Sequence, residues 1–235
     1  MSAMVILAAV SCAKVASSDK GQVTFELSNN QQIADMTKSN VSDYTSLPSA
    51  SDFTITITGA GYSWTGTLSQ WEESNFLAAG EYSVTATYGD LEDEGFDKPY
   101  FTGSESFTVI GGETVNTTIP VQLGNTVVKV SCSEYFKEYY KDYRFELSRN
   151  GSTIATFAKD QNKAAFVDAY KFTLSGTMTS DTKTYTFSKD YTNLAAATAY
   201  TFNFDVANAG SSSITITFKE GYTETIELGD LELND

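Results

Sequence analysis

The sequence predicts an all-β protein made of two tandem antiparallel β-sandwich domains. Three observations support this fold class. Short stretches of alternating apolar and polar residues recur along the chain, polar and glycine-containing turns separate them, and no long segment has the 3.6-residue period of a core helix. The chain has 235 residues, of which 41% are hydrophobic, so it can form a real core in one or two domains.

The alternation locates the strands in order. "FTITITG" (53–59) directs Phe53, Ile55 and Ile57 to one face and threonines to the other. The same pattern recurs at 81–89, 199–206 and 213–221. Further strands are expected near 22–28, 105–110, 117–123, 126–132, 143–149, 153–158, 169–175, 183–188 and 224–233. Helical turns are expected only at 133–141 and near 70–77. Such a succession of short strands is typical of Ig-like or transthyretin-like sandwiches.

A weak internal repeat places the domain boundary. "FLAAGEYSVTATYG" (76–89) resembles "NLAAATAYTFNFDV" (193–206), and the two stretches lie 117 positions apart, about one sandwich domain. Gly124 and Asn125 separate two strand patterns between them. We therefore expect a leader and tether at 1–19, one sandwich at 20–124 and a second at 125–235.

Charge and composition exclude several functions. The net charge is −15, and an acidic surface of this kind repels nucleic acid. Residues 13–124 carry 4 basic and 15 acidic residues, whereas 125–235 carry 11 and 15. The chain has no histidine, which removes Ser-His-Asp and Cys-His catalysis and every histidine metal site. With no nucleophile elbow and no phosphate-binding loop, the sequence predicts neither an enzyme nor a cofactor.

The two cysteines differ in their setting. Cys12 ends the apolar run "MVILAAVSC", which is far shorter than a membrane-spanning helix and resembles the lipobox of a bacterial lipoprotein signal. This predicts lipidation of Cys12 and an outer-membrane anchor, on the surface or the periplasmic face, and the alternative is an ordinary signal peptide. Cys132 shares a strand face with Val128 and Val130, which predicts a buried thiol without a disulfide partner.

Several segments resemble a known family. "LAAGEYSVTATYG", "DKPYFTGSESFTVIGGE" and "NTVVKVSCSEYFKEYYKDYRFEL" are similar to a Bacteroidetes family of surface lipoproteins that contain domain of unknown function 4493. The similarity covers most of 20–180, and 186–235 match in pattern only. It implies an envelope location and a sandwich architecture, and it implies no catalytic residue. The tandem sandwiches resemble fimbrillin-like pilus subunits more loosely.

The acidic stretch "GDLEDEGFDKPYFTG" (89–103) is a candidate metal site. Its carboxylates are those of Asp90, Glu92, Asp93, Glu94 and Asp97. An EF-hand beginning at Asp90 would need a glutamate at its twelfth position, where this chain has Phe101. We therefore interpret the stretch as a solvated connection between strands, with a calcium-dependent loop as the alternative.

Aromatic residues supply the other candidates. Tyr62, Trp64 and Trp71 could form a platform on which a sugar stacks, or the tryptophans could fill the core. Tyr100 is a further candidate contact, although it could instead anchor the acidic loop. The run "EYFKEYYKDYRF" (134–145) could present a ligand surface or cover an open sandwich end, and we expect the cover.

Together these features predict a non-catalytic lipoprotein of the cell envelope that binds a glycan or a protein. The alternative is a structural or accessory subunit of a fimbrillin-like pilus. The only arginines of the chain are Arg144 and Arg149, which counts against pilin maturation by cleavage after an arginine near the N-terminus. Cleavage after Lys14, Lys20 or Lys38 stays open. We expect a membrane partner through the anchor and no nucleic-acid partner.

Overall fold

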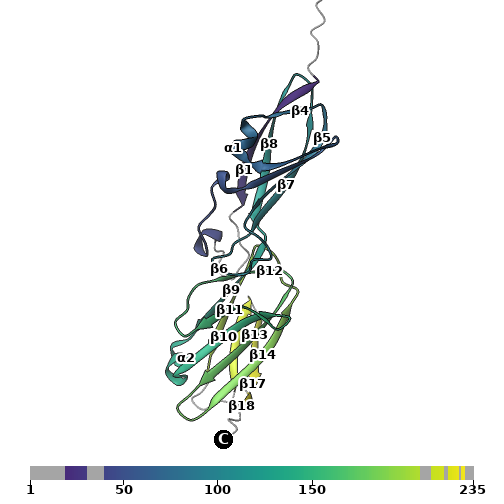
Figure 1. The fold of residues 1–235 in the computed structure, drawn as a ribbon. Coiled ribbons are helices and arrows are strands. Elements are labelled where there is room, and N and C mark those ends of the chain that lie inside the picture. Colours follow the sequence, from purple (N-terminus) through teal and green to yellow (C-terminus); the bar gives the residue numbers. More distant parts are fainter. Residues whose placement is uncertain (1–18, 31–39, 207–212, 220–221, 228, 231–235) are drawn as a thin grey trace, which may run out of the picture.

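The computed structural model describes residues 19–30, 40–206, 213–219, 222–227 and 229–230. Over these residues the protein is almost entirely β-structure, arranged as an elongated molecule with its two halves end to end (Figure 1). The predicted all-β sandwich class is confirmed. None of the helices in this part of the chain has the length and hydropathy that a membrane crossing requires.

The first half forms one seven-stranded sheet that folds over on itself, in the order β3-β2-β5-β7-β8-β1-β4. Its strands are β1 (Lys20–Asn30), β2 (Thr54–Gly59), β3 (Tyr62–Thr67), β4 (Phe76–Ala78), β5 (Gly80–Tyr88), β7 (Phe101–Val109) and β8 (Thr114–Leu123). The helix α1 (Leu68–Glu72) links β3 to β4, and the 3₁₀ turns η1 (Val41–Asp43) and η2 (Ala50–Asp52) precede β2.

The fold in this sheet lies between β7 and β8, which pair only through Phe101–Gly103 and Val121–Leu123. Beyond these residues β8 leaves β7, which gives one layer of β3, β2, β5 and β7 and a second layer of β8, β1 and β4. Gly103 allows the close approach, because a Cβ there would lie 2.1 Å from the carbonyl oxygen of Pro120.

The second half has two separate sheets. One follows the order β11-β10-β13-β14-β18 and the other β17-β16-β15-β9-β12-β6. Its strands are β9 (Asn125–Cys132), β10 (Asp142–Arg149), β11 (Ser152–Ala158), β12 (Ala165–Asp168), β13 (Lys171–Thr179), β14 (Thr184–Thr192), β15 (Thr198–Asp205), β16 (Ser213–Lys219), β17 (Tyr222–Glu227) and β18 (Gly229–Asp230). The helix α2 (Glu134–Tyr139) joins β9 to β10.

The two halves repeat one strand arrangement. The layers β3-β2-β5-β7 and β8-β1-β4 of the first half correspond in order to β11-β10-β13-β14 and β15-β9-β12 of the second. In each half the opening strand pairs in parallel with a late strand, β1 with β8 and β9 with β15, and the other strand pairs are antiparallel. The repeat predicted from 76–89 and 193–206 matched the wrong strands, because β5 corresponds to β13 and not to β15.

Alternation along the strands builds the two cores. Phe53, Ile55 and Ile57 are buried as predicted, while Thr56 and Thr58 face outward and bond hydroxyls on neighbouring strands. The cores meet near Gly124, which alone separates β8 from β9. Phe166 packs with the first core although it lies in the second half of the chain. Most strands lie where alternation predicts them, whereas β3, β4, β6 (Gly95–Phe96) and β12 were not predicted.

Candidate functional site

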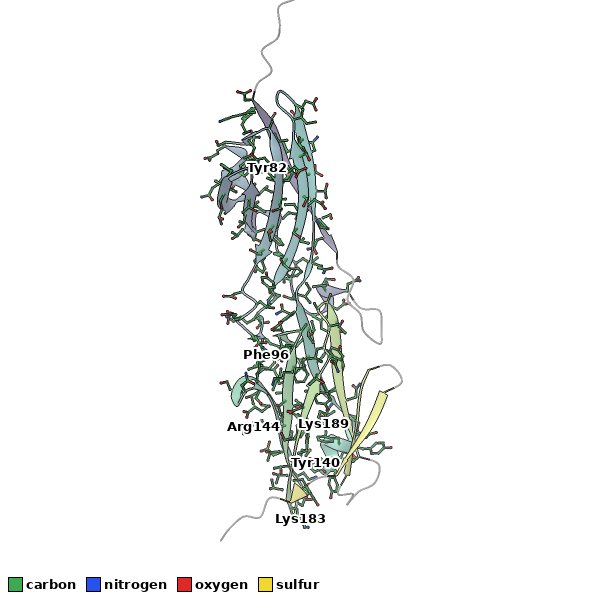
Figure 2. The ribbon with its side chains drawn as sticks, turned by 90° about the vertical axis from the view of Figure 1, so that its right-hand side faces the viewer. Tyr82, Phe96, Tyr140, Arg144, Lys183 and Lys189 are labelled. Atoms are coloured by element: carbon green, nitrogen blue, oxygen red, sulfur yellow. The ribbon has the colours of Figure 1, made fainter. Side chains whose placement is uncertain are left out.

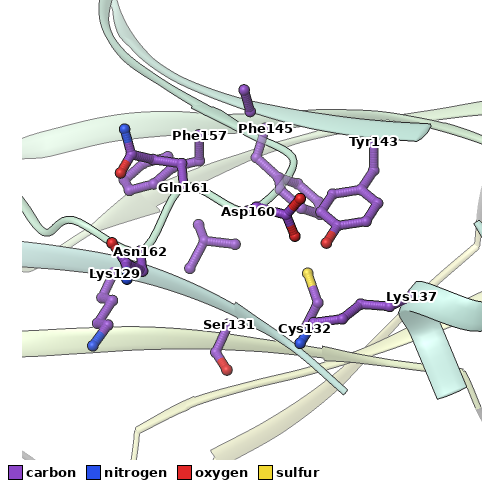
Figure 3. Close-up of a pocket in the computed structure, with 12 residues that line it drawn as sticks. Lys129, Ser131, Cys132, Lys137, Tyr143, Phe145, Phe157, Asp160, Gln161 and Asn162 are labelled. Atoms are coloured by element: carbon purple, nitrogen blue, oxygen red, sulfur yellow. The ribbon is translucent and has the colours of Figure 1, made fainter. Parts of the chain in front are cut away.

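A groove opens beside the second half of β9 (Figure 3). Its volume is about 350 Å³. The residues that line it are Lys129, Val130, Ser131, Cys132, Lys137, Tyr143, Phe145, Phe157, Ala158, Asp160, Gln161 and Asn162. We call it the β9 groove. Its floor is apolar and its rim is polar, a combination typical of binding sites.

The groove exists because β12 is short. β12 pairs with β9 only from Asn125 to Val128, so Lys129–Cys132 have no strand partner on that side. Alternate residues of a strand direct their N–H and C=O groups to opposite sides. The Ser133 N–H donates to Phe204 on β15, so the main-chain groups of Val130 and Cys132 face the groove. Within the described residues, no hydrogen bond is found to those groups.

The thiol of Cys132 lies at one end of the groove and points toward Tyr143 and Asp160 (Figure 3). Burial raises the pKa of Cys132 to about 12, and it outweighs the nearby charge of Lys137, which lowers the pKa. Burial also raises the pKa of Tyr143. Both groups are therefore protonated near neutral pH, and Cys132 cannot act as a thiolate nucleophile there.

Two lysines and one acid supply the charge of the groove. Lys129 and Lys137 lie on the β9 side, and Asp160 lies opposite them. Lys137 also bonds Glu134 at 2.8 Å on the exposed face of α2. The start of α2 is set by Ser133, whose hydroxyl accepts the Phe136 N–H at 3.1 Å and donates to Asp205 at 2.6 Å.

The predicted aromatic platform does not assemble. Trp71 is 1% exposed, packs on Trp64 with ring centroids 5.2 Å apart and belongs to the core, so it cannot stack on a ligand. Trp64 is partly buried against the same core, and Tyr62 is 38% exposed at the turn between β2 and β3. Tyr100 lies half-buried at the junction of the two halves, where its carbonyl oxygen accepts the Gly124 N–H at 2.8 Å.

The acidic stretch is neither a free solvated loop nor a cluster of converging carboxylates. Glu94 accepts bonds from Arg149 at 2.8 Å and from the Asp168 N–H at 2.7 Å, and both partners belong to the second half. Asp93 pairs with Lys98 and Asp97 with Lys163, each at 2.5 Å. The other two carboxylates are exposed, and Asp90 accepts only the local N–H of Glu92. Among the described residues, no three acidic or cysteine side chains gather as a metal site would need.

The two-residue strand β6 also attaches the acidic stretch to the second half of the molecule. β6 pairs with β12 through Gly95–Phe166 and Phe96–Ala165. The ring of Phe96 packs edge-on against Phe157 with centroids 5.1 Å apart, and Figure 2 shows Phe96 within the second half. The stretch therefore ties the first half to the second half, and we name residues 90–98 the acidic clasp.

The aromatic run 134–145 covers the core. Phe136 and Tyr140 are fully buried, and Tyr143 and Phe145 continue the same cluster along β10. Tyr135 is 73% exposed on the opposite face of α2. The predicted lipidation site, Cys12, lies outside the described residues.

Comparison with known proteins identifies the family. The model of a family described as domain of unknown function DUF4493 matches residues 19–229. The chain belongs to this family. The match confirms the resemblance seen in the sequence and extends it over the C-terminal part, where only the pattern had matched. No protein of curated function matches the chain.

Several solved structures are similar to this DUF4493 chain. A proposed cell adhesion protein from Bacteroides eggerthii has 10% identity and a TM-score of 0.50, with 89% of this chain and 96% of that chain covered. A fimbrial assembly protein from Parabacteroides distasonis has 7% identity and a TM-score of 0.47, with 89% and 98% covered. A proposed polysaccharide binding protein from Bacteroides thetaiotaomicron has 12% identity and a TM-score of 0.43, with 88% and 98% covered. At 10% identity, the likeness to the Bacteroides eggerthii structure is one of fold alone.

Sequence patterns did not reveal the β9 groove of this DUF4493 chain. Its walls come from 129–132, 143–145 and 157–162, which meet only through the sheet pairing. Cys132 was expected to be a buried core thiol, and it lies partly exposed at the groove. The sequence contains one indication of the groove. The "KDQNK" stretch at 159–163 has too few apolar residues to close the sandwich there.

Proposed function

We propose that this chain is a non-catalytic binding or adhesion module of the cell envelope. The observation that carries the proposal is the β9 groove, which combines an apolar floor with unpaired main-chain groups of Val130 and Cys132. Such an edge is a ready template for a polypeptide partner. The adhesion role named for the Bacteroides eggerthii structure agrees with this proposal.

The chemistry of the groove favours binding over catalysis. A reaction at this site would need a nucleophile or a base active near neutral pH. The raised pKa of Cys132, about 12, keeps its thiol neutral, and the chain contains no histidine to activate it. The Nζ atom of Lys137 forms an ion pair with Oε1 of Glu134 at 2.8 Å, on the exposed side of α2.

The test is binding by the purified protein without its first 18 residues. A glycan array and a panel of immobilised envelope and matrix proteins would be probed in parallel. We expect saturable binding to one ligand class and no turnover of the bound ligand. The absence of binding on both platforms, or release of a cleaved product, would contradict the proposal.

A fimbrial subunit is the second candidate. The open edge of β9 favours it, because a strand of another copy could pair there. This candidate predicts that purified protein forms linear polymers, visible by electron microscopy and by light scattering after size-exclusion chromatography. A protein that stays monomeric at high concentration argues against it.

We also propose that Cys12 carries a lipid and holds the protein at the outer membrane. The support is the apolar run that ends at Cys12. The test is fractionation of cells that express the full-length gene. Wild-type protein should sediment with membranes, and the Cys12→Ser variant should be released. Soluble wild-type protein with Cys12 intact would refute the anchor.

A further inference from the structure

The first half of the molecule contains the counterpart of the β9 groove. Strands β1 and β4 correspond to β9 and β12 in the repeated arrangement. The pair Gly21–Leu77 joins β1 to β4 at positions that face the core, and we align it with the pair Val128–Ala165, which joins β9 to β12. When the two halves are aligned on these pairs, Val23 and Phe25 on β1 match Val130 and Cys132 on β9.

The first half fills this place with its own tryptophan. The indole N–H of Trp71 donates to the carbonyl oxygen of Val23 at 3.0 Å, and the N–H of Val23 donates to Asn75 at 2.8 Å. The ring lies between Phe25 and Trp64, with centroids 5.6 Å and 5.2 Å away. Trp71 thus closes the edge of β1 and fills the space beneath it.

The second half has no equivalent side chain. Trp71 stands four residues after the end of β3, and the residue four after the end of β11 is Asn162. In the same alignment Ala155 of β11 stands in the place of Trp64 of β3, and the smaller Cys132 of β9 stands in the place of Phe25 of β1. The result is the β9 groove of about 350 Å³, which has an apolar floor and a polar rim and lies beside two unpaired main-chain positions.

We propose that the β9 groove binds an extended segment of a partner protein that inserts an aromatic side chain with a hydrogen-bond donor, as Trp71 does within the first half. This inference rests on the proposed binding function and names the partner as a polypeptide. The donor would bond the carbonyl oxygen of Val130, and the segment would pair with the edge at Val130 and Cys132.

The charge of the groove indicates which residues of the partner segment should flank its aromatic side chain. Lys129 and Lys137 line it with a single acid, Asp160, on a protein whose net charge is −15. Within the described part of the chain Lys129 has no ion-pair partner. The partner segment should therefore carry a carboxylate next to the aromatic residue.

The probes are blocked synthetic peptides of about six residues, the commonest length of a strand, because an added strand pairs along an open sheet edge. Each has alternating valine and threonine, a central tryptophan and one glutamate, whose position varies across the set. Fluorescence anisotropy with the full chain should show saturable binding. Replacing the tryptophan of the peptide by alanine should weaken binding at least about tenfold.

Protein variants locate the binding site. Asn162→Trp should fill the groove and abolish binding, while the matched control Ser152→Trp, outside the groove on β11, should bind normally. Lys129→Glu should weaken binding about threefold to tenfold, and Lys171→Glu should leave it unchanged. Lys129 is half-buried and Lys171 is exposed, and neither belongs to a hydrophobic core, so this comparison holds even if Asn162→Trp fails to fold.

Three results would overturn the inference: no peptide binds at millimolar concentration, the alanine peptide binds equally well, or Lys129→Glu has no effect. Self-association that Asn162→Trp abolishes would assign the groove to a second copy, which also overturns it. Ligand binding on the glycan array without peptide binding would leave the binding function standing and remove only this inference.

Discussion

At the scale of single residues, side chains of different size close one strand edge in the first half and leave the corresponding edge open in the second. Trp71 is a core residue whose indole satisfies the edge of β1. In the second half no side chain of the groove fills the place of Trp71, and Cys132, which stands where β1 has Phe25, is smaller and leaves the edge of β9 open. Burial raises the pKa of its thiol to about 12, because desolvation outweighs the opposing charge of Lys137, and this makes the cysteine inert.

The thiol of Cys132 should react slowly. Its pKa is raised from 9.0 to about 12, so the thiolate fraction at pH 8 falls about a thousandfold. In a Cys12→Ser variant, iodoacetamide should alkylate Cys132 far more slowly than free cysteine, and the rate should keep rising above pH 10. Because the unfolded thiol ionises first, stability linked to this group is present below pH 9 and is lost as the pH rises toward 12. Alkylation at the rate of free cysteine would contradict the burial.

Removing Trp71 should destabilise the first half strongly. Trp71→Ala leaves a cavity and an unpaired Val23 carbonyl group, and we expect a loss of about 3–5 kcal/mol in the free energy of unfolding. Urea denaturation measures this loss. Tyr135→Ala is the matched control, because Tyr135 is 73% exposed and its loss should change stability by less than about 0.5 kcal/mol. Equal effects of the two substitutions would show that Trp71 does not fill the core.

At the scale of elements, the acidic clasp shows how a loop with metal-like composition can be a structural tie. Its carboxylates diverge to Lys98, Arg149 and Lys163 and do not converge on one point. The Glu94–Arg149 pair is nearly buried, with side-chain exposures of 13% and 18%. The pairs of Asp93 and Asp97 are exposed and contribute little.

Breaking the buried pair should cost much more than breaking an exposed one. Arg149→Ala leaves the carboxylate of Glu94 without its cationic partner and should lower the free energy of unfolding by about 3 kcal/mol. Lys163→Ala, which frees the exposed Asp97, should cost less than about 1 kcal/mol. Thermal unfolding compares the two variants. If both have the same melting temperature, the clasp does not depend on Glu94.

Calcium should not stabilise the protein. Three of the five carboxylates in the stretch already have cationic partners. Binding to the native state would raise stability by about 2.7 kcal/mol at a hundredfold excess over Kd. We expect no change in melting temperature with millimolar calcium. A rise that an Asp90→Asn/Asp93→Asn variant abolishes would instead make the clasp a calcium site.

At the scale of the whole molecule, we propose Gly124 as the boundary between two domains that the acidic clasp joins a second time. Alternation at Phe53, Ile55 and Ile57 was enough to predict the sandwiches, because a half-buried strand exposes every second residue. β12 and β6 were missed, since four and two residues are too few for a pattern. The acidic clasp and the β9 groove were missed because their contacts join residues far apart in the chain.

The central claim is that the edge of β9 is open where the corresponding edge of β1 is closed. Residue-resolved amide hydrogen exchange of the free protein by NMR tests it most directly. The Val23 amide, bonded to Asn75, should exchange slowly. The Val130 amide should exchange fast, while its neighbours Lys129 and Ser131, which face β15, stay protected. A Val130 amide as protected as that of Val23 would mean that the groove is closed in solution and would contradict the account.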